Sequence, residues 1–409
     1  MSFNKTFYVI LALILILTTC QREEKVNLEY ANQLHNRILT IDTHCDTPLH
    51  MADTTWDVGV RHEPGSRKSG KIDLPRMKEG GLDVEFFAAF VGQRDRTPEN
   101  YQWAQDKVDE LIQSIKNMCT QYNDRIQLGL FPEDAYQNEA DGLLTAYIGI
   151  ENGFAIGTDL SNIQRYFDMG ARYITLCHTK NNDICDSSND STEHGGLSDF
   201  GVEVVQEMNR LGMIVDVSHI SDEAFYDVLE TTTVPVIASH SSVRALCDNV
   251  RNLSDEMLKA LAENGGVIQI CIFSEYVKKP TPNPEREQAF EALQEKYGPW
   301  SEVTDPEIKE KYRNEYYAIR EKYPVEKANV KDVVDHIDHV VDLIGIDYVG
   351  IGTDFDGGGG VIGCDDISEM PNITHELVRR GYSEEDIEKI WGGNFMRIFR
   401  EVLAHAAAN

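Results

Sequence analysis

Short apolar runs recur along the chain and alternate with stretches whose apolar residues have helical spacing. Each run is about four to seven residues long, which is typical of a buried strand and too short for a helix. We predict strands at Leu39–Asp42, Val84–Phe90, Leu144–Ile150, Tyr173–Cys177, Met213–Val217, Val234–Ala238, Val267–Ile272 and Tyr348–Gly352. Strands and helices that alternate in this way form parallel sheets through right-handed crossovers, and eight such strands close a barrel. The pattern therefore predicts an α/β fold, a (β/α)8 barrel.

Capping residues mark the beginnings of several predicted helices. Ser221, Ser254 and Ser383 are each followed by two acidic residues, a pattern that favours a helix N-terminus. Residues 276–328 break the alternation, because they are rich in proline, charged and aromatic residues and have no strand pattern. We interpret this stretch as an insertion after the seventh strand, on the barrel face that carries active sites. It could be a lid, a subunit contact or an exposed loop.

The first residues have the features of an export signal. Lys5 precedes the apolar stretch Phe7–Leu17, which is too short to span a membrane, and Thr18-Thr19-Cys20 follows. A cysteine after small residues at this place resembles the lipobox of bacterial lipoproteins. We therefore predict a signal peptide at 1–19, a lipid on Cys20, a polar tether at 20–34 and one barrel domain at 35–409. The lipid would anchor an exported protein to the bacterial envelope, at the outer membrane on its periplasmic or surface side. An ordinary cleaved signal peptide is the alternative.

The composition and net charge indicate what kind of protein this is and which partners it can bind. The 409 residues include 41% hydrophobic and 26% charged positions, which is typical of a globular protein, and the net charge is −31. This charge argues against nucleic acid as a partner, because phosphate binding needs clustered Lys and Arg, which the chain lacks. We interpret the acidity as a solvated surface.

The cysteines are better explained as packing residues than as a metal cluster. Eight are present and no CxxC pair occurs. A disulfide between Cys247 and Cys271 is possible in an exported protein. Alternation along a strand points Cys45 away from His44 and Asp46, so we expect a packed thiol there.

Ionisable residues follow six of the eight predicted strands. They are His44 and Asp46 after the first, Glu151 after the third, His178, His219 and His240 after the fourth to sixth, and Asp354 and Asp356 after the eighth. The carboxyl ends of barrel strands meet at one rim, so these side chains should form one ring. Buried ionisable groups are unfavourable unless they are paired or bind a metal. Imidazoles with carboxylates, and no thiolate cluster, favour Zn²⁺ or a similar divalent ion.

Two other features have simpler explanations. His336 and His339 could share a metal on one helix face, but that helix precedes the eighth strand and begins on the wrong side of the barrel. Gly357 to Gly360 could suggest a phosphate cradle, yet no Lys-Ser or Lys-Thr follows, so we expect a flexible loop.

A set of motifs, all in family order from about residue 35 to the C-terminus, resembles the membrane dipeptidase (renal dipeptidase) family. The motifs are Asp42-Thr-His44-Cys-Asp46, Gly149-Ile-Glu151, Thr175-Leu-Cys-His178, Asp216-Val-Ser-His219, Ser239-His240-Ser-Ser, Arg251-Asn252 and Gly352-Thr-Asp354-Phe-Asp-Gly. The resemblance implies a metal-dependent-hydrolase barrel with two Zn²⁺ per subunit and dipeptide substrates, with a D-residue possible at the C-terminal position. A homodimer is a possible assembly.

The resemblance also implies a role for each matching residue. His44 and Asp46 would hold one zinc, His219 and His240 the other, and Glu151 would bridge them. A hydroxide that bridges the ions would attack the peptide carbonyl. His178 would stabilise the oxyanion, and Asp354 would move the proton to the leaving amine. Arg251 and Tyr276 would bind the substrate's C-terminal carboxylate. Asp356 has no implied role and could order its loop.

Two other functions remain open. A hydrolase of the same superfamily that acts on cyclic amides, lactones or phosphotriesters would often have a carboxylated lysine bridge and a His-x-His motif, whereas this chain has Glu151 and His44-x-Asp46. A lipoprotein that binds metal or peptide without turnover would lack a catalytic group, whereas Asp354 and His178 are present.

Overall fold

The structure is a computed structural model that describes residues 27–408, except for residues 65–68, 301–302, 304 and 325. The predicted signal peptide and Cys20 lie outside these residues. Within the described part of the chain, no helix is long and apolar enough to cross a membrane.

Parallel strands at the centre of the molecule form the predicted barrel. In spatial order they are β1 (Ile41–Cys45), β2 (Val84–Phe90), β4 (Leu144–Glu151), β5 (Ala171–Thr175), β6 (Ile214–Asp216), β7 (Ile237–Ser241), β8 (Val267–Cys271) and β9 (Val349–Gly352). The segment after β9 meets the end of β1, where the amides of Asp46 and Asp354 donate to the carbonyls of Phe355 (2.8 Å) and His44 (3.0 Å). The predicted fold class, an α/β barrel, is confirmed. Hydrogen-bonded strands run continuously from β1 to β9, and these contacts between the β1 end and the segment after β9 complete the barrel.

The sequence pattern misplaced some strand boundaries. β5 begins two residues before the predicted position, β7 begins three residues after it, and the short strand β3 (Ile126–Leu128), which pairs only with β4, was not predicted. The β7 segment, Ile-Ala-Ser-His-Ser, is fully buried although its second half is polar. An apolar run is therefore a poor guide to strands that continue into a polar site.

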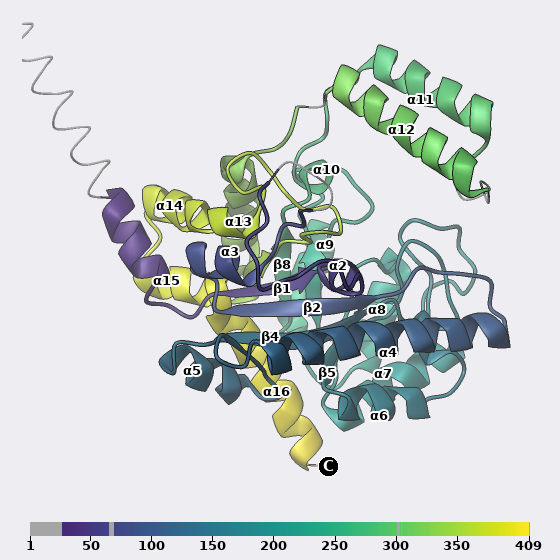
Figure 1. Cartoon of the computed structure of the whole chain (residues 1–409). Helices are drawn as coiled ribbons and strands as arrows, with labels where there is room; N and C mark the ends of the chain where they lie inside the picture. Colours follow the sequence, from purple (N-terminus) through teal and green to yellow (C-terminus); the bar gives the residue numbers. More distant parts are fainter. Residues whose placement is uncertain (1–26, 65–68, 301–302, 304, 325, 409) are drawn as a thin grey trace, which may run out of the picture.

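Helices surround the strands (Figure 1). They are α2 (Pro48–Met51), α3 (Leu74–Glu79), α4 (Pro98–Gln121), α5 (Pro132–Ala140), α6 (Ser161–Asp168), α7 (Asp199–Leu211), α8 (Asp222–Thr231), α9 (Asp255–Asn264), α13 (Val330–Ile344), α14 (Pro371–Arg380), α15 (Glu384–Glu388) and α16 (Asn394–Ala408). Ser221, Ser254 and Ser383 accept hydrogen bonds from first-turn amides of α8, α9 and α15, as predicted.

Aromatic side chains fill the interior near the amino ends of the strands. Tyr147 and Tyr173 each stack on Phe86, and Phe395 of α16 packs edge-on against Phe86. This end of the barrel is therefore closed by apolar packing, which leaves the carboxyl ends of the strands for polar side chains.

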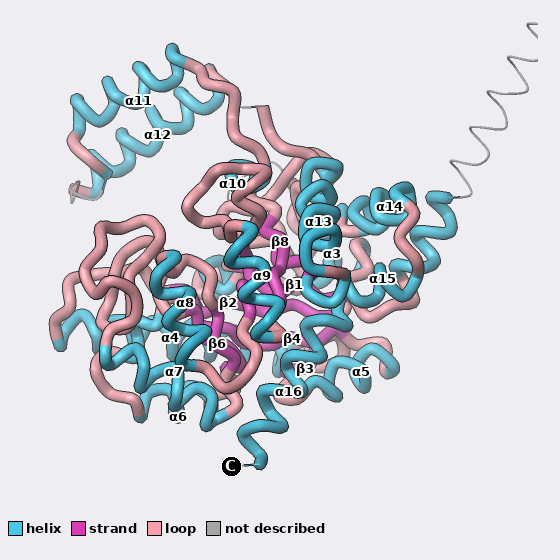
Figure 2. The backbone as a smooth tube through the Cα atoms, turned by 180° about the vertical axis from the view of Figure 1, so that it is seen from behind, coloured by secondary structure: helices cyan, strands magenta, loops and turns pink. Residues whose placement is uncertain are grey.

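The insertion after the seventh barrel strand, β8, is helical. It contains α10 (Ser274–Val277) and a hairpin of α11 (Pro284–Tyr297) and α12 (Pro306–Lys322). The hairpin has its own small core around Leu293, Val303 and Tyr312. It stands apart from the barrel at the end of two loops (Figures 1 and 2).

Residues 27–35, all but the last of which lie in the predicted tether, form a helix that packs against the domain. Ala31 and Leu34 are buried, and the His35 imidazole bonds to Thr374 Oγ1 (2.7 Å) and to the Gly80 carbonyl (2.8 Å). The packed structure therefore begins before residue 35.

The possible disulfide between Cys247 and Cys271 does not form, since both are free buried thiols, and the Cys247 thiol lies 3.4 Å from the Glu275 carbonyl oxygen. Cys45 is likewise a free, fully buried thiol, as expected.

Candidate active site

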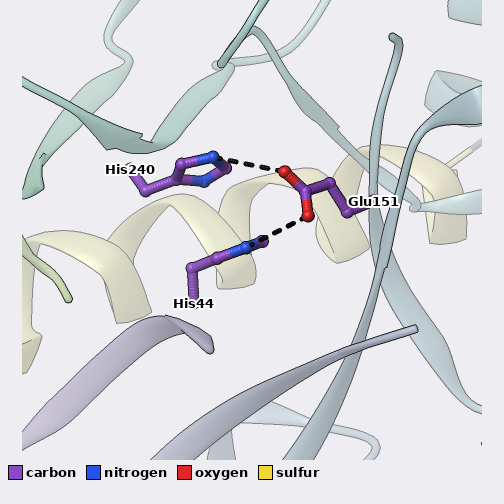
Figure 3. A group of neighbouring side chains, drawn as sticks. All are labelled: His44, Glu151 and His240. Atoms are coloured by element: carbon purple, nitrogen blue, oxygen red, sulfur yellow. Dashed lines mark ion pairs between the residues drawn. The ribbon is translucent and has the colours of Figure 1, made fainter. Parts of the chain in front are cut away.

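Glu151, the last residue of β4, lies at the centre of the ring of strand-end residues. Its Oε2 lies 3.5 Å from His44 Nε2, and its Oε1 lies 3.0 Å from His219 Nε2 and 3.4 Å from His240 Nε2 (Figure 3 shows His44, Glu151 and His240). His178 Nε2 lies 3.8 Å from the same Oε1. One carboxylate thus faces imidazoles on both of its oxygens.

Asp46 and Asp354 complete the ring on the β1 side. Together with His44 they offer three ligand atoms within 4.8 Å of one another. Two further groups have ligand atoms equally close together: one is His44, Glu151 and His240, and the other is Glu151, His178 and His219. The structure therefore brings together seven of the eight strand-end residues in overlapping groups of metal-ligand geometry.

The eighth, Asp356, stays outside these groups and binds neighbouring segments instead. Its carboxylate accepts hydrogen bonds from Thr47 Oγ1 (2.7 Å) and the Lys71 amide (2.8 Å). His336 and His339 are also outside the ring: His336 bonds to the backbone of Val243 and Val277, and His339 bonds to Asp255.

The backbone at the site is unusual. Of the residues that the structure describes, four that are not glycine have positive φ: Asn152 (80°), His219 (73°), Asp354 (58°) and Asp356 (66°). All four belong to the ring or lie next to it. Such conformations are uncommon for residues with a side chain and cluster at functional sites.

Buried hydroxyl groups hydrogen-bond to the Nδ1 atoms of His44 and His240 and so fix the orientation of both imidazoles. Tyr173 Oη lies 2.8 Å from His44 Nδ1, and Ser239 Oγ lies 2.8 Å from His240 Nδ1. Ser239 in turn donates to Asp216 Oδ2 (2.6 Å). Because Ser239 donates to the carboxylate, its oxygen accepts from His240 Nδ1–H, which leaves the Nε2 lone pair free for a ligand bond.

The charges at the ring favour a bound cation. Burial alone would raise the pKa of Glu151, but the surrounding imidazoles of His44, His178, His219 and His240 hold it well below its usual value. Burial opposes a charge on His44, yet the carboxylates of Glu151, Asp46 and Asp354 raise its pKa to about 10. The raised pKa of His44 shows that the carboxylates around it attract positive charge, which a bound cation would supply in place of the proton. Burial lowers the pKa of His240 to about 4, so this imidazole is neutral at pH 7 and can bind a cation directly.

Unpartnered atoms indicate where a cation would bind. His44 Nε2, Asp46 Oδ1 and His219 Nδ1 are buried and have no hydrogen-bond partner in the described residues. Buried polar atoms are normally satisfied, so such a group needs an explanation. The donor set of imidazoles and carboxylates suits Zn²⁺ and similar divalent ions.

The glycines after β9 form a tight turn rather than the expected flexible loop. The amides of Gly357, Gly358 and Gly359 all donate to the Asp354 carbonyl, at 3.2, 3.0 and 2.7 Å. A Cβ on Gly357 would overlap the carboxylates of Asp354 and Asp46. The turn therefore needs glycine in order to hold both acids at the rim.

Comparison with known proteins agrees with this geometry. A model of the family described as membrane dipeptidase (peptidase family M19) matches residues 28–409. The chain belongs to this family. Dipeptidase tcpJ of Claviceps purpurea is 33% identical over 90% of this chain and 78% of its own length. Mouse dipeptidase 3 is 29% identical over 88% of this chain and 64% of its own length.

One solved structure is similar to this dipeptidase-family chain in both fold and sequence. The probable dipeptidase PvdM from Pseudomonas aeruginosa superposes with a TM-score of 0.82 at 32% identity, over 93% of this chain and 99% of that one. A metallo peptidase from Rhodobacter sphaeroides, liganded with a phosphinate mimic of L-Ala-D-Ala, has the same fold, with a TM-score of 0.72 at 22% identity over 89% of this chain and 99% of that one. The protein is therefore a peptide-bond hydrolase.

Arg251 and Tyr276, the predicted carboxylate contacts of this dipeptidase-family chain, lie together beside the ring. The Arg251 guanidinium lies over the Tyr276 ring, 5.3 Å from its centroid, and donates to the His240 carbonyl (3.0 Å). Its Nε is buried and has no partner among the described residues. A buried guanidinium that has a free N–H and lies next to the strand-end residues of the site is suited to bind an anionic group.

Tyr173 and Asp216 were missed as functional residues. Asp216 is the one charged residue in the otherwise apolar stretch Met213–Val217, which is a signal that could have indicated a supporting role. Tyr173 was predicted only as the first residue of a strand, because the sequence does not reveal that its hydroxyl reaches His44 across the barrel.

Proposed function

We propose that the protein is a zinc-dependent dipeptidase that holds two Zn²⁺ per subunit and accepts a D-residue at the C-terminal position of its substrate. The observation that carries the proposal is Glu151, which has histidines against each of its oxygens. His44 and Asp46 would hold one ion, His219 and His240 the other, and Glu151 would bridge them. When bound, the two ions would polarise the scissile carbonyl and make water a nucleophile at neutral pH.

The remaining residues would bind substrate and move protons. Arg251 would form a charge-assisted hydrogen bond with the terminal carboxylate, with Tyr276 beside it. The His178 imidazole, whose side chain is 23% exposed, faces the site and would donate to the oxygen of the tetrahedral intermediate. Asp354 would accept the proton of the attacking water and return it to the leaving amine. Burial raises the pKa of Asp354 to about 7, although His44 opposes the shift, which suits a group that exchanges protons near neutral pH.

Support for a D-residue comes from the Rhodobacter sphaeroides metallo peptidase of the same fold, which binds a mimic of L-Ala-D-Ala. The test is hydrolysis of Ala-Ala and Gly-D-Ala by the purified protein, with and without a chelator, together with metal analysis. We expect both dipeptides to be cleaved and chelation to stop the reaction. Cleavage that survives complete metal removal would contradict the proposal, and cleavage of Ala-Ala alone would remove its D-residue part.

We also propose that the protein is exported and held at the bacterial outer membrane by a lipid on Cys20. The supporting observation is the sequence of the first twenty residues. Mass spectrometry of the N-terminal peptide from the native envelope tests this, since Cys20→Ala should abolish a lipid mass and release the protein from the membrane fraction.

A further inference from the structure

Glu85 is a buried acid that the proposed mechanism does not use. It lies on β2 and is fully buried, and no N–H or O–H group among the described residues donates to its carboxyl oxygens. The Cys45 thiol, a weak donor, lowers its pKa only in part. Across the β1–β2 ladder its register partner is Asp42, which is also fully buried. Two acids therefore sit next to each other beneath the ring. An isolated buried carboxylate would be strongly unfavourable.

Asp42 already accepts hydrogen bonds from the ends of two strands that carry site residues, β1 and β9. Its Oδ1 accepts from the amides of Thr353 (2.7 Å) and His44 (3.3 Å), and its Oδ2 accepts from Thr353 Oγ1 (2.5 Å). A carboxylate can accept about four hydrogen bonds, so one acceptor position of Asp42 remains open. The neighbour that can fill it with a proton of its own is Glu85.

We propose that Glu85 is held as a neutral carboxylic acid that donates a hydrogen bond to Asp42, and that this pair positions the ends of β1 and β9 for the active site. The titratable groups with the largest effect on Glu85 are Asp42, the Cys45 thiol and Asp356, and these three are acids rather than cations. Burial raises the pKa of Glu85 well above its usual value, and the charge of Asp42 raises it further. A proton on Glu85 thus supplies the donor for the open acceptor position of Asp42 and avoids two adjacent buried charges.

The pair acts through the backbone rather than on substrate. Asp42 fixes the amide of His44, and Thr353 directly precedes Asp354, whose φ is positive. Loss of the Glu85 proton would place two like charges side by side and push these strand ends apart. Glu85 is therefore a positioning residue. Its effect on turnover rests on the proposed function, whereas its protonation and its effect on metal retention do not.

The experiment compares two substitutions of similar volume in the full-length protein. Glu85→Gln keeps a donor, because its amide N–H can replace the acid O–H, whereas Glu85→Leu removes the donor. We expect Glu85→Leu to lower Zn²⁺ affinity and kcat/KM by about 10- to 100-fold, the usual range for a residue that supports metal ligands. Glu85→Gln should stay close to the wild type in both. The infrared difference spectrum of wild type minus Glu85→Gln at pH 7 should contain the carbonyl band of a protonated carboxylic acid.

Three results would overturn the proposal: no such infrared band, a Glu85→Leu protein with wild-type zinc affinity, or a Glu85→Gln protein as impaired as Glu85→Leu. If Glu85→Leu fails to fold, the infrared band and the Glu85→Gln protein still decide the question. If the wild type cleaves no dipeptide, the zinc and infrared measurements remain valid, so failure of the proposed function is distinguishable from failure of this inference.

Discussion

Individual carboxylates at the rim differ in what surrounds them, and their proposed roles follow from that difference. Glu151 contacts imidazoles on both oxygens, whereas Asp354 lies with His44 and Asp46 and has a pKa raised to about 7 mainly by burial. We expect Glu151→Gln to lose bound zinc and activity together, by on the order of 100-fold or more, because a neutral amide is a poor bridge. Metal analysis and kcat/KM of the purified variant measure both.

Asp354→Asn should behave differently. We expect it to keep zinc and lose about 10²- to 10⁴-fold in kcat, the usual contribution of a general acid or base. The control is the metal content of the same sample. Full turnover in a zinc-replete Asp354→Asn protein would remove Asp354 from the mechanism.

Arg251 is proposed to recognise the free carboxylate that distinguishes a dipeptide. Replacement by alanine should lower kcat/KM for Ala-Ala about 10- to 100-fold, since a hydrogen bond to a charged group is lost. An amide analogue that lacks the terminal carboxylate should be affected little. Because Arg251 also donates to the His240 carbonyl, zinc content serves as the control for damage to the ring. An equal loss for both substrates would contradict the carboxylate role.

At the scale of elements, the turn after β9 sets the positions of two acids. Gly357→Ala should lower zinc content and activity together, because the added methyl group would displace the Asp354 and Asp46 carboxylates. Gly393→Ala is a matched control, since its added Cβ would come no closer than 3.4 Å to any atom. Circular dichroism and metal analysis of both variants test this; an active Gly357→Ala protein with full zinc would show that the turn has room to adjust.

The connection into β2 contains an acid whose ionisation opposes folding. Burial raises the pKa of Asp83 to about 6, although hydrogen bonds from Thr40 lower it. The folded pKa is above the unfolded value, so the stabilisation is complete below about pH 4 and is lost as the pH rises through about 6. Asp83→Asn should therefore raise Tm relative to the wild type at pH 8 and make little difference at pH 4. Parallel Tm curves for the two proteins across this range would contradict the shift.

For the whole molecule, the metal ions should contribute to stability as well as to chemistry. The ring joins residues from β1, β4, β7 and the segments after β5, β6 and β9, so an ion there binds only the folded chain. A ligand at about 100 times its Kd adds about 2.7 kcal/mol, and we expect chelation to lower Tm by several degrees. Added Zn²⁺ should restore the original Tm, whereas Mg²⁺, which prefers oxygen ligands, should not. An unchanged Tm after verified metal removal would argue against an ion at the ring.

The barrel and the order of its polar strand ends could be predicted from sequence alone, because short apolar runs identify buried strands and the carboxyl ends of parallel strands share one rim. Chain topology alone was therefore enough to predict that His44, Glu151 and His240, far apart in sequence, would meet. Which residues contact each other became clear only in the folded protein: Asp42 pairs with Glu85, Asp216 is linked to His240 through Ser239, and Gly357 lies against two acids. These contacts depend on strand register and on backbone conformations with positive φ, neither of which a single sequence encodes locally. The same reason explains why the sequence allowed a Cys247–Cys271 disulfide that the packed structure does not form.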